Sequence, residues 1–333
     1  MISKEASVRR REFIGLVGGM AIAWPRMVAA QAPGMHRIAL LSPRGPVGES
    51  SPYGKLLVGA LSKLGYTVGQ NLAFEGTRAI EQPAQLQQLL EEFKASKVDV
   101  IVTYGYPAAV AAKTSGIPTV AAFGAGDPIE TGLVANLARP GGSLTGISDD
   151  ATTLSTKRLG LLKELVPTLR SVAMLWNKDD LGMSLRYVAS AKAAQAMGVT
   201  VQAVGVREPE DFNEAFAVMD KERPDAILMV SDSLTVLNRK RVFDYAAAHR
   251  LPAIYEYDPM VHDGGLMSYG PDLTESFARV ASMVDRIFKG DKPADIPFEQ
   301  PTRYLFVINL KTAKSIDLTI PPTLLALADE VVE

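Results

Sequence analysis

Hydrophobic positions along the chain follow two alternating patterns. Short, almost uninterrupted apolar runs occupy residues 37–41, 98–103 and 117–123, and such runs are typical of buried strands. Between them, apolar residues recur every three or four positions, as in residues 53–64 and 86–93, which predicts amphipathic helices. Ser51 and Pro52 precede the first of these helices and suit its N-cap and first turn. The pattern therefore predicts alternating strands and helices.

The second half of the chain repeats this plan. The motifs at residues 65–68, 99–102 and 117–120 each return, in the same order, about 130 residues further on. The first strand, near Ile38, has its counterpart near Val172 at a similar offset. Each echo is weak alone, but four in order predict two lobes of the same βαβ design.

The predicted fold class is α/β, with two Rossmann-like lobes built on parallel sheets and joined by a hinge. We assign residues 36–147 plus about 261–300 to lobe 1, and residues 148–260 plus about 301–333 to lobe 2, with a hinge near 146–150. Ligands of such sheets bind beyond the carboxyl ends of the strands. The loops expected to line an interlobe cleft are 42–53, 104–107 and 123–127 in lobe 1, and 176–178, 231–233 and 255–258 in lobe 2.

Composition agrees with a two-lobed globular chain. The sequence has 333 residues, 47% of them hydrophobic and 22% charged. A net charge of −2 provides no basic field for nucleic acid, so no nucleic-acid partner is expected. Cysteine does not occur, which excludes disulfides, thiolate catalysis and cysteine-ligated metal.

The N-terminus has the pattern of an export signal. Arginines 9–11 precede Phe13, residues 15–24 are apolar and uncharged, and small residues follow at 28–32. The apolar run is shorter than the about 20 residues that span a bilayer. The arginines resemble the twin-arginine type of signal, which exports folded proteins. We predict an export signal over residues 1–32, cleavage near Ala30 and a periplasmic mature protein. A lipid anchor is excluded because no cysteine occurs there.

Sequence motifs for catalysis are incomplete. None of the three histidines has a metal-ligand partner at helical or strand spacing. Residues 141–145 fail the Gly-x-Ser-x-Gly pattern at its last position, and residues 124–129 have Ile where a dinucleotide fingerprint needs its third glycine. We therefore expect a protein that is not an enzyme and uses no cofactor or metal.

Binding chemistry fits the predicted cleft loops better. Tyr106 and Pro107 open a helix whose free amides suit a carboxylate, while Asp127 and Asp232 can hold an ammonium group. Tyrosines in these loops can stack on a flat or apolar ligand. The predicted ligand-binding residues are Ser51, Tyr53, Tyr104, Tyr106, Pro107, Asp127, Asn177, Asp232, Ser233 and Tyr255.

Each of these residues also has a structural interpretation. Asp127 and Asp232 can cap helices, which Asp in post-strand loops often does. The tyrosines can belong to the core, Asn177 can shape its own turn, and Tyr106 can be a surface residue at an ordinary helix start. The sequence alone leaves both interpretations open.

Several motifs resemble those of a known family. They are residues 105–109 (GYPAA), 126–134 (GDPIETGLV), 138–146 (ARPGGSLTG), 157–159 (KRL), 251–255 (LPAIY), 264–270 (GGLMSYG), 307–314 (VINLKTAK) and 318–322 (LTIPP). The chain thereby resembles the ABC transporter substrate-binding proteins of the group that includes tryptophan-type amino-acid binders. Members usually have Thr where this chain has Tyr106.

The resemblance implies a type I periplasmic-binding fold, no chemistry, and delivery of a small-molecule solute, an amino acid or small organic acid, to an ABC permease in the inner membrane. We expect a monomer. The alternatives are a periplasmic sensor subunit that signals to a membrane receptor and, as a third class, a periplasmic enzyme.

Overall fold

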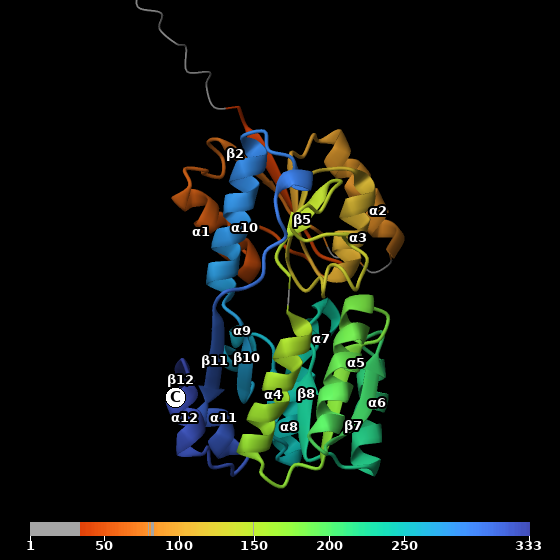
Figure 1. Ribbon diagram of the computed structural model, residues 1–333, viewed down its shortest axis with the longest axis vertical. Helices are drawn as coiled ribbons and strands as arrows, with labels where there is room; N and C mark the ends of the chain where they lie inside the picture. Colours follow the sequence, from red (N-terminus) through yellow and green to blue (C-terminus); the bar gives the residue numbers. More distant parts are fainter. Residues whose placement is uncertain (1–33, 79, 81–82, 149) are drawn as a thin grey trace, which may run out of the picture. The chain divides into compact units, whose positions relative to one another are not determined.

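Two sheets of mainly parallel strands organise the chain, which the computed structural model describes for residues 34–78, 80, 83–148 and 150–333 (Figure 1). Residues Met35–Glu333 form one unit, and everything below concerns that unit. The export signal predicted over residues 1–32 lies outside the described residues. No helix in the described part of the chain is long and apolar enough to cross a membrane.

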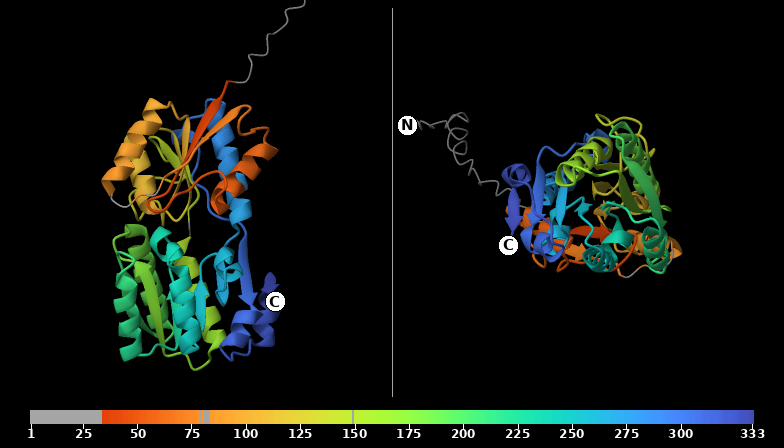
Figure 2. Two further views of the ribbon diagram at one scale, coloured as in Figure 1. Left: turned by 180° about the vertical axis from the view of Figure 1, so that it is seen from behind. Right: turned by 90° about the horizontal axis from the view of Figure 1, so that it is seen from below.

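The first lobe is built around a five-stranded parallel sheet of order β2-β1-β3-β4-β5. Its elements are β1 (His36–Leu41), α1 (Pro52–Lys63), β2 (Leu72–Glu75), α2 (Pro83–Ala95), β3 (Val100–Tyr104), α3 (Tyr106–Ser115), β4 (Thr119–Phe123), β5 (Leu144–Gly146), α10 (Leu273–Phe288) and the 3-10 turn η1 (Pro293–Asp295). Helices cover both faces of this sheet (Figures 1 and 2).

Strand periodicity divides the core of lobe 1 into two layers. Ile38 and Leu40 of β1 point to the layer that α1 and α10 cover, whereas Ala39 and Leu41 point to the layer that α2 and α3 cover. Successive side chains of a strand face opposite sides, so a strand buried on both sides is apolar throughout. This explains the uninterrupted apolar runs in the sequence.

The second lobe contains a seven-stranded sheet of order β12-β11-β10-β9-β8-β6-β7. All its pairs are parallel except β10 with β11. Its elements are α4 (Ala151–Leu165), β6 (Ser171–Asn177), α5 (Leu181–Ala196), β7 (Thr200–Val206), α6 (Asp211–Lys221), β8 (Ala226–Met229), α7 (Ser233–Leu237), α8 (Arg239–His249), β9 (Ala253–Tyr255), α9 (Asp258–His262), β10 (Met267–Pro271), β11 (Tyr304–Asn309), α11 (Leu310–Ser315), α12 (Pro322–Leu327) and β12 (Glu330–Val332). The predicted α/β fold with two lobes of parallel sheets is confirmed.

The chain passes between the lobes three times: between β5 and α4, between β10 and α10, and between η1 and β11 (Figure 1). The second passage corrects one predicted boundary. Lobe 1 was expected to resume at about residue 261, but β10 pairs with β9 and β11 of the seven-stranded sheet, so the return follows Pro271. A strand and turn can join either sheet, and only pairing decides which.

Candidate functional site

A cavity lies where the carboxyl ends of both sheets meet. It has a volume of about 100 Å³, several times the space that one water molecule needs. Its lining comes from both lobes: Ser42, Arg44, Gly45, Pro46, Val47, Tyr53, Tyr104, Gly105, Phe123 and Gly124 from lobe 1, and Ser231, Asp232, Ser233, Val236, Leu237 and Tyr257 from lobe 2. This size suits a small molecule.

Aromatic rings form one wall of the cavity. The rings of Tyr104 and Phe123 stack with centroids 5.3 Å apart and planes 8° apart. The ring of Tyr53 contacts both, with its centroid 5.2 Å from that of Tyr104 and 4.8 Å from that of Phe123. The ring of Tyr257, in lobe 2, packs edge-on against Phe123 with a centroid distance of 5.6 Å. Burial raises the pKa of Tyr53 to about 12, so this phenol remains neutral. The wall offers flat apolar area with neutral phenols.

The lining from lobe 2 includes a polar segment, here called the polar wall, which is the loop that follows β8 (Ser231, Asp232 and Ser233). Asp232 is the N-cap of α7: its Oδ1 accepts hydrogen bonds from the backbone N–H and the hydroxyl of Thr235, at 2.9 and 3.0 Å. Its Oδ2 accepts one from Nδ2 of Asn177, at 2.7 Å. These bonds fix the carboxylate beside the cavity while the residue itself is only 8% exposed.

Among the residues that the structure describes, no ion pair balances the charge of Asp232. Within the described residues, no Lys, Arg or His nitrogen lies within 4.0 Å of its carboxylate, and the three donors above are neutral. The carboxyl group of Asp180 interacts electrostatically with the charge of Asp232. Burial, and after it the charge of Asp232, raise the pKa of Asp180 from 3.8 to about 7. The polar wall therefore places a negative charge beside the cavity, whose lining also contains one cation, Arg44 of lobe 1.

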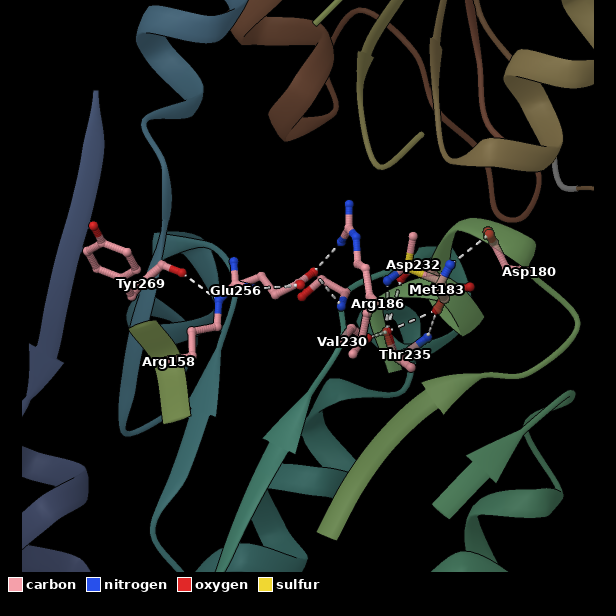
Figure 3. A network of polar contacts seen from close by, with 10 residues as sticks. Arg158, Asp180, Met183, Arg186, Val230, Asp232, Thr235, Glu256 and Tyr269 are labelled. Carbon is pink, nitrogen blue, oxygen red and sulfur yellow. Dashed lines mark hydrogen bonds and ion pairs between the residues drawn. The ribbon is translucent and has the colours of Figure 1, made fainter. Parts of the chain in front are cut away.

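A buried ionic network supports the polar wall (Figure 3). Glu256 lies between two arginines, with Oε1 2.9 Å from Nη1 of Arg158 and Oε2 2.7 Å from Nη1 of Arg186. The three side chains are 2–3% exposed. Oε2 also accepts the backbone N–H of Ser231 at 2.8 Å, and Nε of Arg158 donates to the carbonyl of Tyr269 at 2.7 Å. The network thus ties the cavity loop to α4, α5 and β10.

The two lobes also contact each other directly. Oγ of Ser42 and Oγ of Ser233 lie 3.4 Å apart, and Nη2 of Arg44 donates to the carbonyl of Arg207 at 3.0 Å. Gly126 and Gly182 meet so closely that a Cβ added to Gly126 would lie 3.0 Å from the Cα of Gly182. Small residues therefore permit the lobes to approach each other.

Four of the ten sequence-predicted site residues line the cavity: Tyr53, Tyr104, Asp232 and Ser233. Asn177 lies behind the lining, where it donates to Asp232. Asp232 caps α7, as its structural interpretation predicted, and it also lines the cavity; its contact with a ligand stays a prediction.

The other five lie outside the described lining of the cavity. Ser51 is the N-cap of α1, with Oγ accepting the N–H of Gly54 at 3.1 Å. Asp127 caps its own turn by accepting the N–H groups of Ile129 and Glu130. Tyr106 and Pro107 open α3, where the Tyr106 hydroxyl donates to the carbonyl of Thr131 at 3.4 Å. Tyr255 is buried in the core beside Phe243, 5.2 Å between centroids.

Sequence reasoning named the loops that carry Arg44, Phe123, Ser231 and Tyr257 but did not select these residues. Phe123 ends a strand predicted as buried, and Tyr257 is two residues beyond the tyrosine that was selected. A search for aromatic residues at the ends of predicted strands would have found both. In the residues that the structure describes, no group of three or more His, Asp or Glu side chains is placed to hold a metal ion.

Two α/β lobes with a small cavity between their strand ends define a binding protein of the type I periplasmic-binding class. The model of the ABC transporter substrate-binding protein family matches residues 55–332. The chain belongs to this family, as its motifs predicted, and the family implies a small-molecule ligand and an ABC permease as partner.

Individual relatives agree with this assignment. The chain is 25% identical over 266 residues to the tyrosine-binding protein of Clostridioides difficile (strain R20291), covering 79% of this chain and 76% of that protein. The ABC domain from Streptococcus pneumonia in complex with L-Trp is 24% identical with a TM-score of 0.78, over 89% of this chain and 99% of that one. A conserved domain protein from Vibrio cholerae O1 biovar eltor is 23% identical with a TM-score of 0.80, over 90% and 99%. At these identities the two solved structures establish the fold.

Proposed function

We propose that the protein captures a small solute with a flat apolar body and a protonated amino group in the interlobe cavity, and delivers it to the permease. Tyr53, Tyr104 and Phe123 would contact the body of the solute. Asp232 and Ser233 would contact its amino end. The protein acts as a monomer, binds no nucleic acid and performs no chemistry on the solute.

The observation that carries this proposal is that the buried carboxylate of Asp232 is hydrogen-bonded but has no cationic partner among the described residues. A buried carboxylate is costly unless it is hydrogen-bonded and its charge is compensated. Asp232 has neutral hydrogen-bond donors but, within the described residues, no cationic partner, and it lines the cavity. An ammonium group in the cavity would supply that missing charge through a charge-assisted hydrogen bond.

The relatives support the same class of solute. One is named for binding tyrosine and another was solved with L-Trp, and each of these ligands combines a flat ring with an ammonium group. We therefore infer an aromatic amino acid or a related amine as the solute. The aromatic wall supplies stacking area and the polar wall supplies the negative charge.

We also propose that the mature protein works in the periplasm. Substrate-binding proteins of ABC importers are typically exported, and residues 1–32 have the pattern of a twin-arginine signal with cleavage near Ala30. Mass spectrometry of the protein purified from its host would give the mature N-terminus. A mature chain that retains residues 1–30 would contradict this proposal.

Calorimetric titration with L-tyrosine, L-tryptophan and desamino-tyrosine tests the role of Asp232. The wild-type protein should bind at least one of the two amino acids, and desamino-tyrosine about ten- to hundredfold more weakly than L-tyrosine, because a hydrogen bond to a charged group is lost. Asp232→Asn should weaken amino-acid binding by a similar factor, since Asn caps a helix as well as Asp but has no charge.

Asp225→Asn is the matched control, because the Asp225 carboxylate also accepts backbone N–H groups, those of Arg170 and Ser171, and does not line the described cavity. It should leave the affinity unchanged. Wild-type affinity in Asp232→Asn, or equal affinity for L-tyrosine and desamino-tyrosine, would contradict the proposal.

A further inference from the structure

The interlobe cavity has an edge that reaches solvent. Among the described residues that line it, only Pro46 of lobe 1 and Leu237 of lobe 2 are exposed. Leu237 is 57% exposed. A single exposed leucine is ordinary on a protein surface, but Leu237 also lines the cavity and contacts the other lobe. We call this edge, formed by Gly45, Pro46 and Leu237, the mouth of the cavity.

Leu237 packs against the backbone of lobe 1 at the mouth. A Cβ added to Gly45 would lie 3.2 Å from Cδ1 and 3.5 Å from Cδ2 of Leu237. Gly45 has φ +72°, so a glycine suits both the backbone conformation and the close approach of the leucine. One side of the mouth is therefore a direct contact between the two lobes.

The lobe 1 side of the mouth is anchored to its own lobe. Before Gly45, Oγ of Ser42 donates to the carbonyl of Arg44 at 2.6 Å. After Pro46, the N–H of Val47 donates to the carbonyl of Thr77 at 2.8 Å. The tip of this loop lies between two fixed points, so it moves with lobe 1.

The lobe 2 side of the mouth belongs to the polar wall. Leu237 is the last residue of α7, and Asp232 is the N-cap of the same helix. The end of α7 is fixed by Asn238, whose Nδ2 donates to the carbonyl of Leu234 at 2.9 Å. One short helix therefore carries both the carboxylate that faces the solute and the leucine at the mouth, and both move with lobe 2.

We propose that the contact between Leu237 and Gly45 is a latch that retains the bound solute, so that Leu237 is a positioning residue that sets the dissociation rate. This inference rests on the proposed function, because it requires the solute in this cavity. Since each side of the mouth is anchored to its own lobe, the latch opens when the lobes separate. Breaking the contact then adds to the barrier that the solute must cross to leave.

Stopped-flow kinetics of Leu237→Ala test the latch, with L-tyrosine and L-tryptophan as the probes. The variant should release its solute about three- to tenfold faster than the wild-type protein, because a partly buried apolar contact is lost. Its association rate should not fall, since a smaller side chain does not obstruct entry. Its melting temperature should stay close to the wild-type value, because Leu237 is largely in solvent.

Leu327→Ala is the matched control. Leu327 is 55% exposed on α12 and lies outside the described lining of the cavity. It removes the same atoms from a leucine of similar exposure, so both rates should equal those of the wild-type protein.

Gly45→Ala tests the same contact from lobe 1. The added Cβ would press against Leu237 and should speed dissociation, but it should have a smaller effect when Leu237 is already alanine. Gly132→Ala is its control, because Gly132 has φ +72° and nothing within 4 Å of an added Cβ. Both glycine variants strain the backbone, and only Gly45→Ala should change the dissociation rate.

Three results would overturn the inference while leaving the proposed function standing. They are a wild-type dissociation rate in Leu237→Ala, an equal acceleration in Leu327→Ala, and an effect of Gly45→Ala that is the same with leucine or alanine at position 237. A wild-type protein that binds neither L-tyrosine nor L-tryptophan would instead contradict the proposed function itself, and the inference with it.

Discussion

The two walls of the cavity are held in place by different forces. On the lobe 1 side, rings pack against one another: Tyr53, Tyr104 and Phe123 lie within 5.3 Å of each other, centroid to centroid. On the lobe 2 side, the loop carrying Asp232 is fixed by a helix cap and by the buried carboxylate of Glu256. The repeated βαβ plan places both loops at strand ends, but the side chains that secure them differ.

This difference divides recognition between the lobes. Packed rings provide a flat apolar contact area for a solute but do little to orient it, because dispersion and the hydrophobic effect are not directional. A carboxylate with fixed hydrogen bonds offers charge and direction over little area. A solute that needs both walls gains most of its binding free energy only when the lobes are together, which couples binding to closure.

The largest effect is expected in lobe 2. Glu256→Ala would leave the buried guanidinium groups of Arg158 and Arg186 without their shared carboxylate, and removing one partner of a buried pair costs about 3–5 kcal/mol. The lobe 1 control is Glu75→Ala, which breaks a half-exposed pair with Arg37 and should cost at most about 1 kcal/mol. Urea unfolding midpoints measure both. Equal midpoints would refute the contrast between the walls.

A pH effect is expected next, again in lobe 2. The raised pKa of Asp180, about 7 against 3.8, means that the folded protein binds this proton more tightly than the unfolded chain. Its contribution to the free energy of unfolding is therefore most favourable below 3.8 and falls by roughly 2–4 kcal/mol as the pH rises to about 7.

Asp180→Asn is the variant that isolates this effect, because Asn can still cap α5. Its unfolding free energy, measured from pH 4 upwards, should fall less steeply with rising pH than that of the wild-type protein. Parallel pH profiles would show that Asp180 does not titrate in this range.

A smaller effect is expected where the lobes touch. Gly126 has φ +75°, and an added Cβ would lie 3.0 Å from Gly182 of the other lobe. Gly126→Ala should therefore cost about 1–2 kcal/mol of stability and also weaken solute binding. Gly132 has φ +72° with nothing within 4 Å of an added Cβ, so Gly132→Ala should cost the same stability without affecting binding. Identical affinities in the two variants would show that the contact does not limit closure.

The smallest effect concerns a single bond between the lobes. Arg44→Met removes the hydrogen bond from the guanidinium to the carbonyl of Arg207, an exposed contact worth about 0.5–1.5 kcal/mol. Calorimetric titration with L-tyrosine should show an affinity reduced about three- to tenfold, with little change in the urea midpoint. An unchanged or higher affinity would show that this bond does not stabilise the bound arrangement.

Much of the fold could be predicted because apolar runs and amphipathic spacings are local. They predicted the strands and helices of both lobes, and the parallel topology then placed the strand-end loops around one cleft. Tyr53, Tyr104, Asp232 and Ser233 were found in this way, by their place after strands. The second start of lobe 1 was misplaced because the choice of sheet for β10 depends on pairing with β11, which is distant in sequence.

The direction in which each side chain points could not be predicted from the sequence. Tyr104 and Tyr106 are two residues apart, yet the backbone changes from strand to helix at Gly105, φ 82°, so one lines the cavity and the other does not. Tyr255 and Tyr257 differ for a similar reason, because β9 ends at Tyr255 and sends its ring into the core below. Asp127 and Asp232 both lie in loops that follow strands, but Asp232 lines the cavity, whereas Asp127 caps a turn outside the described lining.

By itself, the sequence determined that this protein has two α/β lobes, which loops meet between them, and to which family it belongs, because these depend on local periodicity and on contiguous motifs. Only the tertiary structure decided which wall is aromatic and which is charged, that the Asp232 carboxylate has no cationic partner among the described residues, and that Glu256 is shared by two buried arginines. Those properties arise from residues that lie far apart in the chain, and their chemistry depends on burial that no local pattern records.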